Sequence, residues 1–211
     1  MRTMSLRYNE KARRAQERRS VILHTLRSNP LAAGAAGATC IIGACVSIAN
    51  ALVLTAMLAV LLPLIAFISS VERERLGKIV RPAFYCFISA LTVFLLSLFL
   101  DLTVAEGCVE ALGIYAPLLA FDGLVLARTA EDAPLLTVRE SLTESITTVI
   151  CAAVIAIPIG AVREIFAVGK LFSKPVETGS VFSNPFFGFI LCGFLLAAFR
   201  AAIAHFAKEG R

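Results

Sequence analysis

The chain has 211 residues, of which 58% are hydrophobic and only 17% are charged, and its net charge is +5. This composition is too apolar for a water-soluble domain of this length. The sequence also lacks a P-loop, a Gly-x-Gly-x-x-Gly motif and a Cys-x-x-Cys motif, so any redox or energy-coupled role requires other subunits of a complex. The basic residues are not interleaved with aromatic ones in a groove, and we expect no nucleic-acid binding.

Residues 1–28 form a basic segment with eight Lys or Arg residues. We expect it to lie in the cytoplasm and to anchor the orientation on anionic lipid, with docking of a cytoplasmic partner as the alternative. Residues 29–206 form the membrane domain, and residues 207–211 are a cytoplasmic tail. The domain contains six apolar stretches of a length close to one membrane span, at 31–49, 51–70, 83–100, 111–127, 141–162 and 185–206. The sequence therefore predicts an all-α integral membrane protein with six transmembrane helices.

The basic residues indicate the orientation of these spans. When the six stretches are threaded in turn, 17 of the 20 Lys and Arg fall on one side, that is, all except Arg163, Lys170 and Lys174. By the positive-inside rule, both termini are cytoplasmic.

The first and fourth spans contain features that interrupt helices. Residues 31–40 are almost all small, which permits close backbone packing inside the protein or a broken half-helix. The fourth span contains Pro117 and then Asp122-Gly123. Interruptions at corresponding positions of spans 1–3 and 4–6 predict an inverted 3+3 repeat, with the functional site near the membrane midplane.

Charged side chains and cysteines within the spans are the candidate site residues. Asp122 is an intramembrane carboxylate and hence a candidate for an ion pathway, although it could instead reach the interface or pair with Arg128. Arg163 and Glu164 close the fifth span, where Arg suits a helix C-terminus and the adjacent Glu does not, and this leaves room for an ion-pathway role. Among six widely spaced cysteines, Cys40 stands out because it lies near mid-membrane. A metal site at Cys40 would need ligands from other spans or another subunit.

Several segments resemble the membrane subunits of Rnf electron-transport complexes and of the Na⁺-translocating NADH:quinone reductase. Residues 162–172 resemble the Arg-Glu-Leu/Ile-x-Gly-x-Gly-x-Leu-Phe segment of that family, and residues 112–119 resemble its Leu-Gly-Ile-Phe-x-Pro-Leu-Ile segment. Residues 126–130 resemble its Gly-Arg-Ala stretch, and Asn29-Pro30 and Cys40 also agree. The resemblance covers roughly 29 to 206 and is greatest to the E-type Rnf subunit and the D-type subunit of the quinone reductase.

The resemblance implies a bacterial inner-membrane subunit that pairs with a homologous sister subunit, in an assembly coupling electron transfer to Na⁺ or H⁺ movement. In the family, one Cys from each of the first and fourth spans is thought to hold a [2Fe–2S] cluster together with two from the sister subunit. Here the fourth-span position is Gly123, preceded by Asp122. Because a thiolate is missing, loss of the cluster is favoured, with Cys40 and Asp122 as the alternative ligand pair. A six-span uptake component and a cofactor-free structural subunit are the alternative functions.

Overall fold

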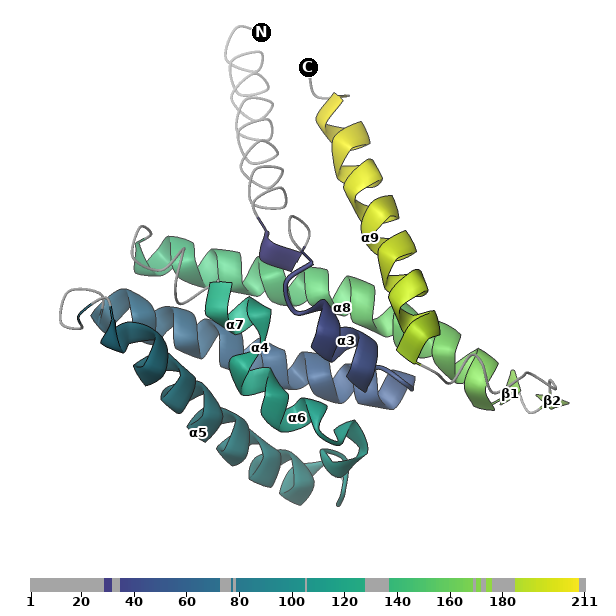
Figure 1. The fold of residues 1–211 in the computed structure, drawn as a ribbon, viewed down its shortest axis with the longest axis horizontal. Helices are drawn as coiled ribbons and strands as arrows, with labels where there is room; N and C mark the ends of the chain where they lie inside the picture. The colour runs from purple at the N-terminus through teal and green to yellow at the C-terminus, as the bar shows by residue number, and fades with distance from the viewer. Residues whose placement is uncertain are drawn as a thin grey trace, which may run out of the picture.

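A computed structural model describes residues 29–31, 35–72, 77, 79–104, 106–127, 137–168, 170–171, 174–175 and 185–208. The elements in chain order are α3 (Ala38–Ala44), α4 (Ile48–Glu72), α5 (Val80–Thr103), η1 (Glu110–Leu112), α6 (Tyr115–Leu118), η2 (Leu119–Phe121), α7 (Gly123–Ala127), α8 (Val138–Val168), β1 (Lys170–Leu171), β2 (Lys174–Pro175) and α9 (Pro185–Lys208) (Figure 1). The two short strands pair antiparallel, with Lys170 opposite Pro175.

The centre of the fold is the packing of α4 on α8, which is the most extensive contact between two helices of the described chain. The buried face of α4 repeats at helical spacing through Leu54, Leu58, Leu61 and Ile65. Small residues on α8 allow the two helices to approach closely. A Cβ atom at Gly160 would lie 3.1 Å from the Ala51 Cβ of α4 and 2.6 Å from the backbone oxygen of Ser47, the residue before α4, so this position must be glycine.

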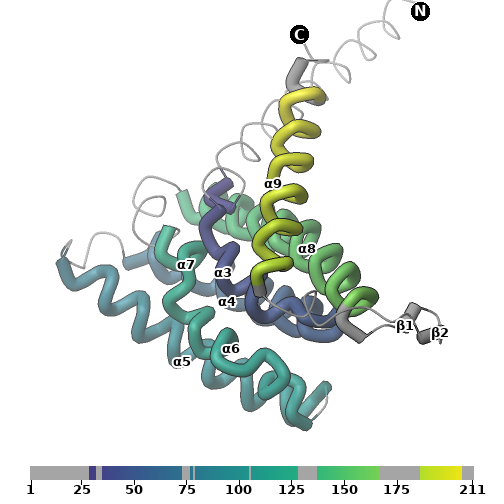
Figure 2. The backbone as a smooth tube through the Cα atoms, turned by 45° about the vertical axis from the view of Figure 1, so that its right-hand side comes forward, coloured from purple at the N-terminus to yellow at the C-terminus, as the bar shows by residue number. Residues whose placement is uncertain are grey.

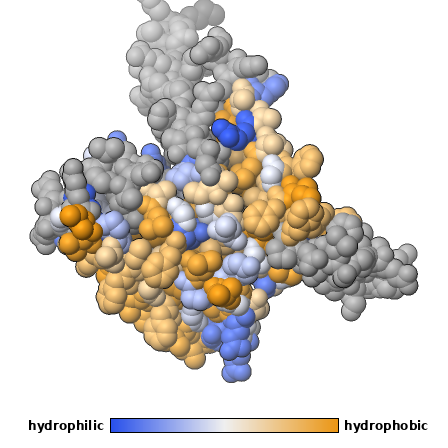
Figure 3. All heavy atoms as spheres, viewed as in Figure 1, coloured by the Kyte–Doolittle hydropathy of each residue, from blue (hydrophilic) through white to orange (hydrophobic). Residues whose placement is uncertain are grey.

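Helices α5 and α9 bury much less of their surface. Only Tyr85, Ser89 and Val93 of α5 are buried, and large apolar side chains such as Phe94 and Phe189 are exposed on the two helices. Figure 3 shows apolar side chains over most of the surface of α5. In Figures 1 and 2, α9 extends away from the helices that surround α4. Helices that are apolar on their outer surfaces are suited to a lipid environment or to contact with other membrane subunits.

Four helices in the described part of the chain are long and apolar enough to cross a membrane, within the ranges Ile48–Glu72, Val80–Thr103, Val138–Phe166 and Phe186–His205. They confirm the predicted spans at 51–70, 83–100, 141–162 and 185–206. The described parts of the first and fourth predicted spans contain short helical pieces, as their small residues, proline and glycine indicated. The predicted six-span count and inverted repeat stay predictions, and residues 1–28 lie outside the described residues.

Charged residues lie near both ends of α8. At its start, Thr137 and Glu140 form a reciprocal capping box, in which the Thr137 N–H donates to Glu140 Oε2 at 3.0 Å and the Glu140 N–H donates to Thr137 Oγ1 at 3.4 Å. Glu140 thus lies in the first turn of α8. At its other end the helix continues beyond the apolar stretch to Val168, so Arg163 and Glu164 lie inside it.

Candidate functional site

The interruptions of the first and fourth spans meet each other. The first span turns through Ala35 and Gly37, whose φ angles are 53° and 79°, before α3 begins. The fourth span breaks at Asp122, which is extended (φ −66°, ψ 151°) between η2 and α7. A Cβ atom on Gly123 would lie 3.2 Å from the Gly37 backbone nitrogen, so the two breaks are in direct backbone contact. The first turns of α3 and α7 therefore start side by side.

Asp122 joins these two helix starts. It is only 4% exposed, and its Oδ2 accepts a hydrogen bond from the Leu124 N–H at 3.3 Å, which is the bond made by a helix N-cap. The same oxygen lies 2.6 Å from the position that a Cβ on Gly37 would occupy. The buried Cys40 side chain lies close enough to the Asp122 carboxyl group for the two to interact. The structure thus brings together the two residues that the sequence predicted as cofactor ligands.

Arg163 and Glu164 lie at the other end of α3. Arg163 is 1% exposed and donates through its guanidinium to the carbonyls of Ile42 and Cys45, the latter at 3.3 Å. Glu164 Oε2 accepts from the Ile48 N–H at 2.8 Å. The cation therefore binds the C-terminal end of α3 and the anion binds the N-terminal end of α4, each matching the sign of the helix dipole there.

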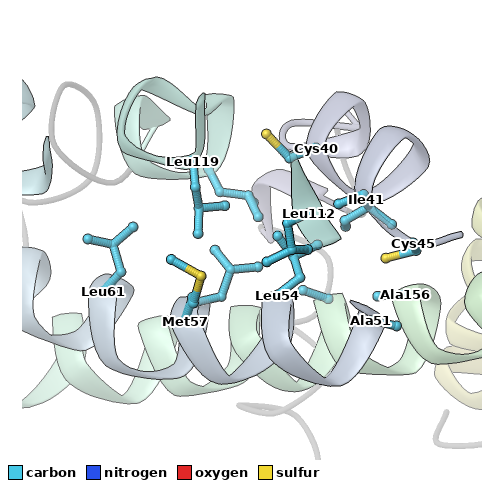
Figure 4. Packing of buried hydrophobic residues seen from close by; sticks show 14 of the residues in the cluster. Cys40, Ile41, Cys45, Ala51, Leu54, Met57, Leu61, Leu112, Leu119 and Ala156 are labelled. Atoms are coloured by element: carbon cyan, nitrogen blue, oxygen red, sulfur yellow. The ribbon is translucent and has the colours of Figure 1, made fainter. Parts of the chain in front are cut away.

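The predicted site residues are consequently divided between two places. Helix α3 has seven residues, so its ends are roughly 10 Å apart at 1.5 Å per residue. Cys40 and Asp122 lie toward its start, and Arg163 and Glu164 lie at its end. Figure 4 shows Cys45 at the end of α3 near Ala51 of α4, while Cys40 lies farther from α4. The two cysteines therefore lie at different ends of α3.

Three further residues position α3, and the sequence analysis did not identify them. Asn50 donates through Nδ2 to the carbonyls of Ala44 at 3.3 Å and Ala111 at 3.0 Å, which ties the end of α3 to η1. Gly43 faces the ring of Tyr115 so closely that any Cβ would overlap it. Gly188 lets α9 pass over Arg163 and the end of α3. Only the polarity of Asn50 within an apolar stretch could have indicated its role.

The junction offers two donor groups to a metal, one thiol and one carboxylate. Within the described residues, there is no group of three or more His, Cys, Asp and Glu side chains that could hold a metal ion. A metal at Cys40 and Asp122 would therefore need further ligands from another chain. On its own, the pair consists of two buried side chains at the starts of two interrupted segments.

Comparison with known families agrees with the pattern of spans and motifs. The family model described as "Rnf-Nqr subunit, membrane protein" matches residues 19–204. The match begins ten residues earlier than the resemblance found in the sequence, so it includes the end of the basic segment. No curated protein matches the chain. Because the family match covers most of the chain and the apolar helices agree with it, the chain is a multi-pass membrane protein that belongs to the Rnf-Nqr subunit family.

Proposed function

We propose that this chain is a core membrane subunit of an Rnf/Nqr-like complex that couples electron transfer to the translocation of Na⁺ or H⁺. The observation that carries the proposal is the family match over residues 19–204. The meeting of two interrupted segments at Gly37 and Gly123 supports it, because interrupted helices in membrane transporters place functional groups near the midplane.

The proposal includes a partner, namely a second membrane subunit of the same family in the opposite orientation. The chain has no motif for a nucleotide or flavin, so electrons must enter and leave through other subunits. The outer surfaces of α5 and α9 carry large apolar side chains that are free to contact lipid or a neighbouring subunit. We place the chain in the bacterial inner membrane with both termini in the cytoplasm, on the basis of its basic residues.

Ion-pathway roles for Asp122, Arg163 and Glu164 stay predictions. The contacts of Arg163 and Glu164 assign them a structural task, since each satisfies backbone groups at the α3–α4 junction. Asp122 is the one of the three that lies where the interrupted segments meet. A change in ion movement after substitution of Asp122 would therefore be easier to interpret than one after substitution of Arg163 or Glu164.

The test uses inside-out membrane vesicles from the native host, with the gene deleted and then restored. Uptake of ²²Na⁺ and acidification of the lumen are followed after addition of NADH or reduced ferredoxin as electron donor. Deletion should abolish donor-driven uptake of one of the two ions, and the restored gene should recover it. The matched control is Arg200→Met, which alters an exposed arginine of α9 and should behave like the restored wild type. Unchanged donor-driven uptake of both ions in the deletion strain would contradict the proposal.

A further inference from the structure

We propose that α5 and the fourth span enclose a binding site for one phospholipid whose headgroup carries a primary amine. The site is a cavity of about 410 Å³ between α5 and the segment that contains η1, α6 and η2. Figure 1 shows these elements side by side, and they are in contact. The volume lies in the range of pockets that hold small molecules. The proposal goes beyond the proposed function and does not depend on which ion or electron carrier the complex uses.

The length of the cavity matches one leaflet of the bilayer. Its lining residues on α5 include Ala90, Phe94, Ser97 and Asp101, which recur every three or four residues and so form one stripe of the helix. The stripe rises about 17 Å at 1.5 Å per residue, and one leaflet contributes about 15 Å of the hydrocarbon core. Because Ala90 lies near the middle of α5 and Asp101 near its end, the cavity extends from mid-membrane to one membrane surface. In the orientation given by the basic residues, this is the outer surface.

The wall that faces α5 is made of small apolar residues. Ala116 and Ala120 line the cavity and are buried, and a Cβ on the lining residue Gly113 would meet no atom within 4 Å. Such residues leave space that larger side chains fill in a close-packed interior. At the rim, Phe94 and Phe121 are 59% and 55% exposed. The rim is therefore apolar and faces away from the protein, so an acyl chain enters the cavity from the bilayer without crossing a polar surface.

The width of the cavity excludes a helix of another subunit as its occupant. A volume of about 410 Å³ that extends over roughly 17 Å has a mean width of roughly 5–6 Å. An α-helix with its side chains is about 10–12 Å wide. The cavity therefore suits a single extended chain.

The end of the cavity at the membrane surface is acidic. Asp101 and Glu110 are the charged residues that line it. Asp101 Oδ1 accepts hydrogen bonds from the Cys108 S–H at 3.5 Å and the Val109 N–H at 3.3 Å, which holds the carboxylate between α5 and η1. In the part of the chain that the structure describes, neither carboxylate forms an ion pair. Residues 82–127 also contain no Lys, Arg or His. The nearby sequence thus supplies no cation to this end of the cavity.

This charge distribution selects the headgroup. The ammonium group of phosphatidylethanolamine is attracted to the two carboxylates, whereas the anionic headgroup of phosphatidylglycerol brings no cation and is repelled by them. A metal ion does not fit the rest of the wall, because divalent cations take about six oxygen ligands. The one hydroxyl among the lining residues, that of Ser97, already donates to the Val93 carbonyl at 2.8 Å.

The experiment measures which lipids stay bound when the space or the charge is changed. The complex is isolated from native membranes in a mild detergent and washed with detergent that contains phosphatidylethanolamine and phosphatidylglycerol in equal amounts. The retained lipids are then extracted and counted by mass spectrometry. Ala90→Phe and Ser97→Leu each fill part of the cavity. Ala83→Phe is the matched control, since Ala83 is an exposed residue of α5 that does not line the cavity.

A second set of variants changes the charge and fills no space. Asp101→Asn/Glu110→Gln neutralises the acidic end and keeps an oxygen that accepts from the Val109 N–H. Glu106→Gln is its control, because Glu106 is exposed and does not line the cavity. Gel filtration checks that each variant elutes with the complex. The charge variants test the proposal even where a filling variant does not assemble.

The proposal predicts that the wild-type complex retains phosphatidylethanolamine in preference to phosphatidylglycerol. Each filling variant should lose one phosphatidylethanolamine per complex, and Ala83→Phe should lose none. Asp101→Asn/Glu110→Gln should lower the ratio of phosphatidylethanolamine to phosphatidylglycerol by about two- to fivefold, as expected for exposed ion pairs, whereas Glu106→Gln should leave it unchanged. Free ethanolamine in the wash should displace no lipid, because the acyl chain supplies most of the buried apolar area.

Several results would overturn the proposal. One is an equal lipid count in the wild type and in the filling variants that assemble, and another is loss of a protein subunit with no loss of lipid. An unchanged lipid ratio in Asp101→Asn/Glu110→Gln would contradict the assigned headgroup. Displacement of the lipid by free ethanolamine would show that the site recognises a small amine instead. None of these measurements depends on ion uptake, so failure of the lipid site and failure of the proposed transport function can be told apart.

Discussion

Replacing Arg163 with methionine should destabilise the chain strongly, because it removes the group that binds the end of α3. Methionine is similar in length and apolar, so it fills much of the space while losing the guanidinium. Two backbone carbonyls, those of Ile42 and Cys45, then lose their donor. The helix α9 passes over this point at Gly188, and Arg163 is 1% exposed, so water has little access to replace the lost bonds.

The expected cost follows from these two carbonyls. A buried acceptor left without a donor costs about 1–3 kcal/mol, and losing a cation at a helix C-terminus adds about 0.3–1 kcal/mol. Hydrogen bonds between membrane helices are often weaker, at about 0.6 kcal/mol on average. We therefore expect the free energy of unfolding to fall by about 2–4 kcal/mol, which is in the lower part of the range obtained by adding these costs. For a chain of this size, 1 kcal/mol shifts the midpoint of thermal unfolding by about 2–4 °C, so this midpoint should fall by roughly 5–15 °C.

The assay is heating in detergent followed by gel filtration of the fraction that stays monodisperse. Arg200→Met is the control, since it makes the same replacement on the exposed surface of α9. Arg163→Lys should give an intermediate loss, because a single ammonium cannot reproduce the planar fork that reaches two carbonyls. If Arg163→Met and Arg200→Met shift the midpoint equally, the capping role assigned to Arg163 is wrong.

Three other predictions follow from the same contacts and from the charge pattern. Glu164→Ala should lower stability by about 1 kcal/mol through loss of the cap on Ile48, and Glu164→Gln by less because an acceptor oxygen remains; equal thermal shifts for the two would contradict this. Gly43→Ala should destabilise the chain by about 1–3 kcal/mol because its methyl group meets the Tyr115 ring, and Tyr115→Ala in the same chain should restore part of the loss, as measured by the same heating assay. Reporter fusions in the loops after α4 and α7 should report cytoplasm and those after α5 and α8 the outside, and reversal at two of these sites would refute the orientation.

Hydropathy alone was enough to predict the four long helices, because each is a continuous apolar segment of about the membrane thickness. The interruptions of the first and fourth spans could also be predicted from the sequence, from the small residues around Gly37 and from the Asp122-Gly123 pair. The proximity of Cys40 and Asp122 came from the family resemblance rather than from spacing, since 82 residues separate them.

The role of Arg163 and Glu164 could not be predicted in the same way. The sequence suggested that Arg163 interacts with the end of its own helix, because the apolar stretch ends at residue 162. In the structure α8 continues to Val168, and the two side chains cap other helices whose partner residues are 116 to 121 positions away. Such contacts depend on how helices pack, and local patterns of charge carry no information about them.

The central claim, that this chain works as a subunit of an Rnf/Nqr-like complex, is tested most directly by isolating it from its native membrane in a mild detergent. The chain would carry an affinity tag, and the co-purifying proteins would be identified and quantified by mass spectrometry. The account predicts a second membrane subunit of the Rnf-Nqr family in equal amount, together with subunits that carry flavin or iron–sulfur centres. Recovery as a monomer under several gentle conditions, or together with an ATPase in place of these subunits, would contradict it.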